Sequence, residues 1–143
     1  MSGLAQVCEM TMPIRWGDMD AAGHVNNTVY FRFMEQIRLS WLERSGHLGA
    51  IGHGDGAVIA NASATFVRAL HYPGVVVARM YVGQPGRSSW DTAYELFRRD
   101  EPETVYATGT ARCVWMDYST GRSTPMPDSL RRAILEPTCF YIE

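Results

Sequence analysis

One stretch of the chain repeats its apolar residues with the period of a helix. Between about residues 27 and 45 they recur every three or four positions, which places them on one helical face. They are Tyr30, Phe33, Met34, Ile37, Trp41 and Leu42. Asn26 or Asn27 can cap the first turn and Gly46 can end the last, since these residue types favour those positions. The pattern predicts one long amphipathic helix.

Most of the remaining chain has the shorter periods of strands. Alternating or continuous apolar residues predict strands at 7–16, 58–66, 75–82, 90–98 and 104–116. Short turns separate the later strands, and such connections are typical of an antiparallel meander. A second, short helix is expected at 128–135.

Two of the expected strands carry small residues on one face. They are Ala60, Ala62 and Ala64 in one strand, and Ala107, Gly109 and Ala111 in the other. A concave sheet lined with small side chains lets a bulky helix pack closely against it. We therefore expect an α+β fold, a curved antiparallel sheet of about five strands wrapped around one long central helix. A length of 143 residues is typical of a single domain.

Composition and charge exclude several classes of function. The 13 basic residues, all arginine, nearly balance the 15 acidic ones, which argues against a nucleic-acid partner. Codon bias is the simplest reason for the absence of lysine, and it excludes Schiff-base and Walker-type lysine chemistry. No apolar stretch reaches the ~20 residues of a membrane span, and the first residues do not resemble a secretion signal.

The cysteines indicate a reducing compartment. Cys8, Cys113 and Cys139 are far apart and form no CxxC pair, so neither a disulfide framework nor a zinc site is expected. We expect buried thiols in a cytoplasmic protein. His24 with Asp20, or His47 with His53, lacks a convincing third ligand, so no metal is expected.

Polar groups concentrate just before the predicted helix. Residues 18–27 contain Asp18, Asp20, His24, Asn26 and Asn27. Taken alone, such a segment is more typical of a polar turn that caps a helix. It also suits catalysis, because the free N–H groups at a helix N-terminus polarise a carbonyl. A nearby carboxylate can attack that carbonyl or activate a water molecule to do so.

The string Gly-Asp-Met-Asp-Ala-Ala-Gly-His-Val-Asn-Asn at 17–27, with Glu35 and Arg38 on the helix, resembles a known family. It is similar to hotdog-fold thioesterases of the 4-hydroxybenzoyl-CoA thioesterase type, in particular the fatty acyl-CoA branch that carries Gly-His-Val-Asn-Asn. The resemblance continues at 86–89 and 107–111. It implies a homodimer or homotetramer with active sites between protomers. Aryl-specific relatives carry Pro-Ala-Gly at 21–23, where this chain has Ala-Ala-Gly, which disfavours an aromatic substrate.

The resemblance also implies roles for individual residues. Asp20 would act as nucleophile or general base, and the N–H of about Asn27 would polarise the thioester carbonyl, while Asp18 would support the turn. Substrate contacts are expected from residues of two segments, namely His24, Asn26 and Tyr30 in one and Arg87, Ser88 and Ser89 in the other. The second segment reads equally well as a plain hairpin turn. The glycine-rich residues 46–56 are either a flap over the acyl chain or a connector.

These observations predict a cytoplasmic acyl-CoA thioesterase. An activated thioester needs no full catalytic triad, and the chain has no Gly-x-Ser-x-Gly motif. CoA would be part of the substrate, with no separate cofactor, no nucleic-acid partner and no membrane partner. Two alternatives stay open, namely an acyl-carrier-protein thioesterase and a non-catalytic protein that binds acyl thioesters.

Overall fold

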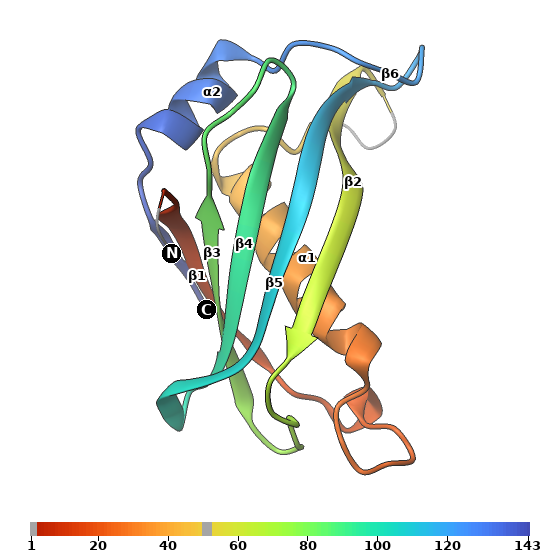
Figure 1. The fold of residues 1–143 in the computed structure, drawn as a ribbon, viewed down its shortest axis with the longest axis vertical. Coiled ribbons are helices and arrows are strands. Elements are labelled where there is room, and N and C mark those ends of the chain that lie inside the picture. The colour runs from red at the N-terminus through yellow and green to blue at the C-terminus, as the bar shows by residue number, and fades with distance from the viewer. Residues whose placement is uncertain (1–2, 50–52) are drawn as a thin grey trace.

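The computed structural model describes residues 3–49 and 53–143 (Figure 1). Its elements in chain order are β1 (Ala5–Pro13), the short 3-10 helix η1 (Trp16–Asp18), α1 (Asn27–Arg44), β2 (Asp55–Phe66), β3 (Val75–Val82), β4 (Ser89–Arg98), β5 (Glu101–Asp117), β6 (Arg122–Ser123), α2 (Asp128–Leu135) and β7 (Phe140–Ile142). Residues 50–52 of the glycine-rich segment, where a flap was one of the two expectations, lie outside the described residues.

The strands form one sheet in the order β2-β5-β4-β3-β1-β7, and β6 pairs with β5. Neighbouring strands are antiparallel except β1 and β7, which run parallel. α1 packs against one face of the curved sheet, and α2 lies at the end of the molecule where α1 finishes (Figure 1). β2 forms an edge of the sheet, so its outer backbone groups have no neighbouring strand within residues 3–49 and 53–143.

The predicted α+β class, with an antiparallel sheet and a packed helix, is confirmed. Two details of that prediction are wrong, because the sheet has seven strands instead of about five and α1 has only 18 residues. The additional strands β6 and β7 have two and three residues. Segments of two or three residues are too short to show the period of a strand in the sequence. They are strands because they pair with β5 and β1.

The predicted alternation along β2 is interrupted by a bulge at Ala60. Ala57 pairs with Trp115 before the bulge and Ala62 pairs with Ala111 after it, whereas regular pairing would keep Ala60 in register. An extra residue in one strand reverses which face the following side chains occupy. Val58 therefore lies on the opposite face from Ala62, contrary to the sequence prediction.

The buried face of α1 contains the six predicted apolar residues and also Arg38. These side chains pack against the small residues of β5, where Ala107 and Ala111 are 0% and 2% exposed. At Gly109, between them, a Cβ atom would lie 2.5 Å from Sδ of Met34 and 3.0 Å from the backbone oxygen of Ser63. Glycine is therefore the residue that lets α1 approach the sheet this closely.

Substitution of Gly109 by alanine is expected to destabilise the fold by about 1–3 kcal/mol, because the added methyl crowds the Met34 contact. Alanine is otherwise the better residue within a strand, so crowding is the only source of a loss. Gly17→Ala is the matched control, since a Cβ there meets no atom within 4 Å. Urea unfolding of both variants measures the difference, and equal stabilities would contradict the packing argument.

Candidate active site

The loop between η1 and α1 presents Asp20 on the surface. An isolated bridge between Met19 and Val25 closes the loop, and the Asp20 N–H donates to the His24 carbonyl at 2.9 Å. Gly23 turns the chain with a φ of 79°, a conformation that glycine adopts without strain. The exposed position leaves the carboxylate of Asp20 accessible to a ligand.

The carboxylate of Asp20 is held beside the N-terminus of α1. It accepts hydrogen bonds from the Ala22 N–H at 2.9 Å and from Nδ2 of Asn26 at 3.2 Å. Asn26 is the N-cap, and its Oδ1 accepts the Thr28 N–H at 2.9 Å. The N–H of Asn27 precedes the first intrahelical hydrogen bond and has no acceptor among the described residues. A carboxylate and a free helical N–H therefore lie close together.

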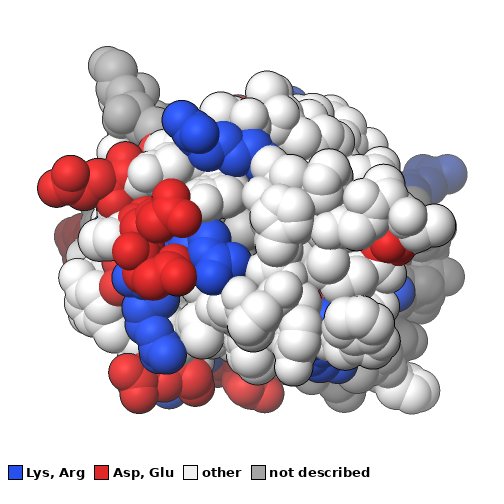
Figure 2. Space-filling view, turned by 90° about the horizontal axis from the view of Figure 1, so that it is seen from below, with Lys and Arg blue, Asp and Glu red and all other residues white. Residues whose placement is uncertain are grey.

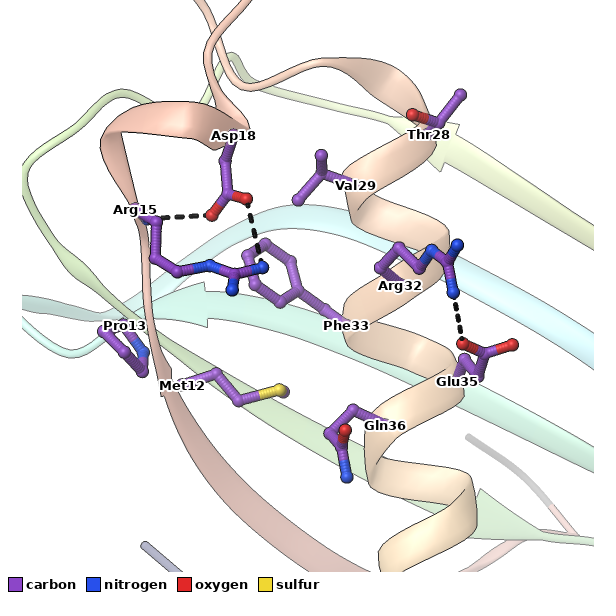
Figure 3. A pocket seen from close by; sticks show the side chains of 10 residues that line it. All are labelled: Met12, Pro13, Arg15, Asp18, Thr28, Val29, Arg32, Phe33, Glu35 and Gln36. Atoms are coloured by element: carbon purple, nitrogen blue, oxygen red, sulfur yellow. Dashed lines mark hydrogen bonds and ion pairs between the residues drawn. The ribbon is translucent and has the colours of Figure 1, made fainter.

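Asp18 is buried and supports the turn before the loop. Its side chain is 8% exposed, accepts the Arg15 N–H at 2.8 Å and lies 3.6 Å from the Arg15 guanidinium (Figure 3). It also lines a cavity of about 630 Å³ between β1 and α1, together with Val29 and Phe33. A second groove of about 300 Å³ lies between α1 and the strands β2 and β5. Thr28 lines both spaces, and Asp20 lines neither.

His71, which the sequence reasoning missed, supports the Asp20 loop from the chain before β3. Its Nδ1 donates to the Gly23 carbonyl at 3.1 Å, and its ring meets the His24 ring edge-on with centroids 4.8 Å apart. Arg98 donates to the His71 carbonyl at 2.9 Å and pairs with Asp100. Arg98 is thus engaged within the chain. No sequence signal connects segments this far apart.

The end of the molecule that carries this loop is only partly charged (Figure 2). Charged side chains gather at one side of this face, and most of the rest is uncharged. Large exposed side chains here include Trp16 and Tyr72, which are 75% and 44% exposed and meet edge-on at 5.8 Å. An uncharged surface beside the Asp20 loop suits contact with an apolar group of a ligand.

Tyr30 lies in the core, and its hydroxyl bonds to backbone. The side chain is 3% exposed, donates to the Arg68 carbonyl at 3.1 Å and accepts the Leu70 N–H at 2.9 Å. Burial raises its pKa, so the hydroxyl stays neutral. These contacts anchor the start of α1, and a direct contact of Tyr30 with substrate stays a prediction.

Arg87, Ser88 and Ser89 lie at the opposite end of α1 from Asp20 (Figure 1). Backbone hydrogen bonds fix this turn, including Trp115 N–H to the Ser88 carbonyl at 2.7 Å. Arg131 of α2 also donates to the Arg87 carbonyl at 3.2 Å. One chain therefore does not bring the two predicted halves of the site together.

The comparisons with known proteins identify the family of the chain. The family model described as the thioesterase-like superfamily matches residues 14–134. The chain belongs to this superfamily. A solved structure of PA2801 from Pseudomonas aeruginosa, named as a candidate thioesterase, is 37% identical with a TM-score of 0.86, over 91% of this chain and 99% of that one. The more specific branch that carries Gly-His-Val-Asn-Asn stays a proposal.

Other solved structures share the fold. A 1,4-dihydroxy-2-naphthoyl-CoA thioesterase from Synechocystis is 17% identical with a TM-score of 0.83, over 92% of this chain and 97% of that one. A candidate acyl-CoA thioesterase from Xanthomonas campestris is 25% identical with a TM-score of 0.73, over 85% of this chain and 100% of that one. No curated protein matches the sequence.

Two of the thiols in this superfamily member are poor nucleophiles. Burial raises the pKa of Cys8 to about 12 and that of Cys113 to about 11, so both stay protonated near neutral pH. Among the described residues, no group of three or more His, Cys, Asp or Glu side chains could hold a metal ion. No helix in the described parts is long and apolar enough to cross a membrane.

Alkylation of the native protein at mildly alkaline pH should modify Cys139, which is partly exposed, and leave Cys8 and Cys113 unmodified. The thiolate is the reactive form, and burial suppresses it at the other two positions. Mass spectrometry after iodoacetamide treatment reads the outcome, and treatment in denaturant, which exposes all three thiols, is the control. Rapid native labelling at Cys113 would contradict the assignment.

Proposed function

We propose that the chain hydrolyses an acyl-CoA thioester to a free acid and CoA. The observation that carries the proposal is the hydrogen bond between Asp20 and Asn26, because it holds a carboxylate beside the capped N-terminus of α1. Membership of the thioesterase-like superfamily supports thioester hydrolysis. The names of related structures support CoA as the carrier of the acyl group.

In the proposed mechanism the thioester oxygen accepts the free N–H of Asn27. The positive end of the helix dipole stabilises the negative charge that develops on this oxygen. Asp20 then acts in one of two ways. As a nucleophile it forms a mixed anhydride and releases the CoA thiolate, and water later hydrolyses the anhydride. As a general base it takes a proton from water while the water oxygen attacks the carbonyl, and the tetrahedral intermediate then expels the CoA thiolate, which takes up that proton and leaves the free acid.

A second copy of the chain would complete the proposed site. Arg87, Ser88 and Ser89 lie far from Asp20 within one chain, so the partner's turn would hold the phosphates and pantetheine of CoA. The free edge of β2 supports this arrangement, because an unpaired strand edge favours pairing with another strand. Ile59 and Phe66 of β2 are partly exposed on the face beside α1, where Ile59 lines a groove and Phe66 meets the Tyr30 and Phe31 rings. We propose a cytoplasmic homodimer or homotetramer.

Asp20→Asn should reduce thiol release from a responsive acyl-CoA by roughly a hundredfold or more, since the amide neither attacks nor accepts a proton. Asp91→Asn is the matched control, because that carboxylate is exposed and forms a surface ion pair with Arg112. A panel of acyl-CoAs and one acylated carrier protein are followed by thiol release. Unchanged thiol release by Asp20→Asn would contradict a catalytic role for Asp20. Binding without release by the wild type would favour the non-catalytic alternative, and release only from the carrier protein would favour that substrate.

The shared site predicts complementation between two inactive variants. An oligomer built only of Asp20→Asn chains, or only of Arg87→Ala chains, has a defect in every one of its sites. A mixed dimer then contains one intact site, so equal mixing should restore about a quarter of the wild-type activity. The mixture is assayed after co-refolding, with each variant refolded alone as control. No recovery in a mixture shown to contain mixed oligomers would contradict the shared site.

A further inference from the structure

The groove between α1 and the strands β2 and β5 is lined by apolar side chains and by the charged Arg32, Glu35 and Arg38 of α1. Phe31 and Met34 of α1 face Ala62 and Ala111 of the sheet across it. It runs from Thr28 to Arg38, about 15 Å along the helix at 1.5 Å per residue. Its volume is about 300 Å³. Its Thr28 end lies beside the N-terminus of α1, where the thioester is proposed to react.

Arg38 lines the end of this groove farther from the N-terminus of α1, and a chain of hydrogen bonds holds its guanidinium there. Arg38 is only 8% exposed, and its Nη1 donates to the Tyr94 hydroxyl at 3.0 Å. The Thr92 hydroxyl donates to the Ala111 carbonyl at 3.0 Å, because a carbonyl only accepts. Thr92 therefore accepts the Tyr94 proton at 2.6 Å, and the Tyr94 oxygen accepts from Arg38. This order of donors fixes the guanidinium before any ligand arrives.

No carboxylate pairs with Arg38 anywhere in residues 3–49 and 53–143. Glu35 also lines the groove, but its Oε1 lies 3.0 Å from Nη1 of Arg32. A buried charge without a counter-ion costs stability, and a guanidinium has more N–H donors than the one used on Tyr94. The groove therefore ends in a positive charge that still has donors available.

We propose that Arg38 binds a carboxylate at the far end of the acyl group, which makes ω-carboxyacyl-CoA the preferred substrate class. This inference rests on the proposed function, since the thioester must lie at the Asn27 N–H. The side chain of a helical residue leans toward the helix N-terminus, so the gap from thioester to guanidinium is shorter than the helical distance. Medium-length dicarboxylic acyl groups, from adipoyl to sebacoyl, match it. Their methylenes would lie against Phe31, Met34 and Ala62.

The test compares acyl groups of equal length with and without the distal carboxylate. Adipoyl-, suberoyl- and sebacoyl-CoA are assayed against hexanoyl-, octanoyl- and decanoyl-CoA. The wild type should prefer the dicarboxylic member of at least one pair. Arg38→Met should reduce kcat/KM for that member by about tenfold to a hundredfold and leave its partner nearly unchanged, as expected for loss of a hydrogen bond between charged groups. Arg38→Lys should keep part of the preference, because it retains the charge without the planar fork.

Arg112→Met is the matched control, since it removes an arginine that is half exposed on the sheet surface. Thermal unfolding and the oligomeric mass of each variant show that the fold is intact. Equal activity on both members of every pair, or an equal loss on both in Arg38→Met, would overturn the inference and leave the hydrolase proposal standing. If no acyl-CoA is hydrolysed, binding is measured by the shift in Tm. A larger shift with suberoyl-CoA than with octanoyl-CoA, abolished in Arg38→Met, still supports the carboxylate site, and equal shifts overturn it.

Discussion

The close contact between α1 and β5 determines how the rest of the molecule is arranged. Met34 of α1 packs directly on Gly109, which has no side chain. Ala107 and Ala111, on either side of Gly109, have small buried side chains, so α1 can lie close to the sheet. The large residues of α1 can then fill the concave face and become buried. Because a helix is narrower than the sheet, grooves remain along both of its sides. The same contact that builds the core therefore creates the spaces in which a ligand can lie.

The position of α1 also decides which groups can act together. Its N-terminus carries Asp20 beside a free N–H, and Thr28 there lines both grooves. The turn that contains Arg87 lies at the other end of the helix (Figure 1). A ligand as long as an acyl-CoA would have to pass both regions. If both regions contact the substrate, as proposed, this separation is the physical reason for a second copy of the chain.

The parts of the structure that follow local periods could be predicted from the sequence. The period of α1 predicts its buried face because burial itself imposes that spacing. The bulge at Ala60 and the strand β7 could not be predicted, since each arises from pairing with a distant strand. The motif placed Asp20 beside the helix N-cap. The contact of His71 with Gly23 joins residues 48 positions apart, and no local pattern reports it.

Arg38 shows why a charged residue on a helix cannot be assigned to the surface from its type alone. Its position falls within the apolar stripe of α1, and Tyr94 supplies a hydrogen bond that only the folded sheet provides. Codon bias explains why the chain has no lysine. At this buried position, however, an arginine and a lysine would behave differently. Burial lowers the pKa of an ammonium group, whereas a guanidinium keeps its proton and directs several donors in one plane. At this end of the groove, arginine is therefore the residue that maintains a permanent positive charge.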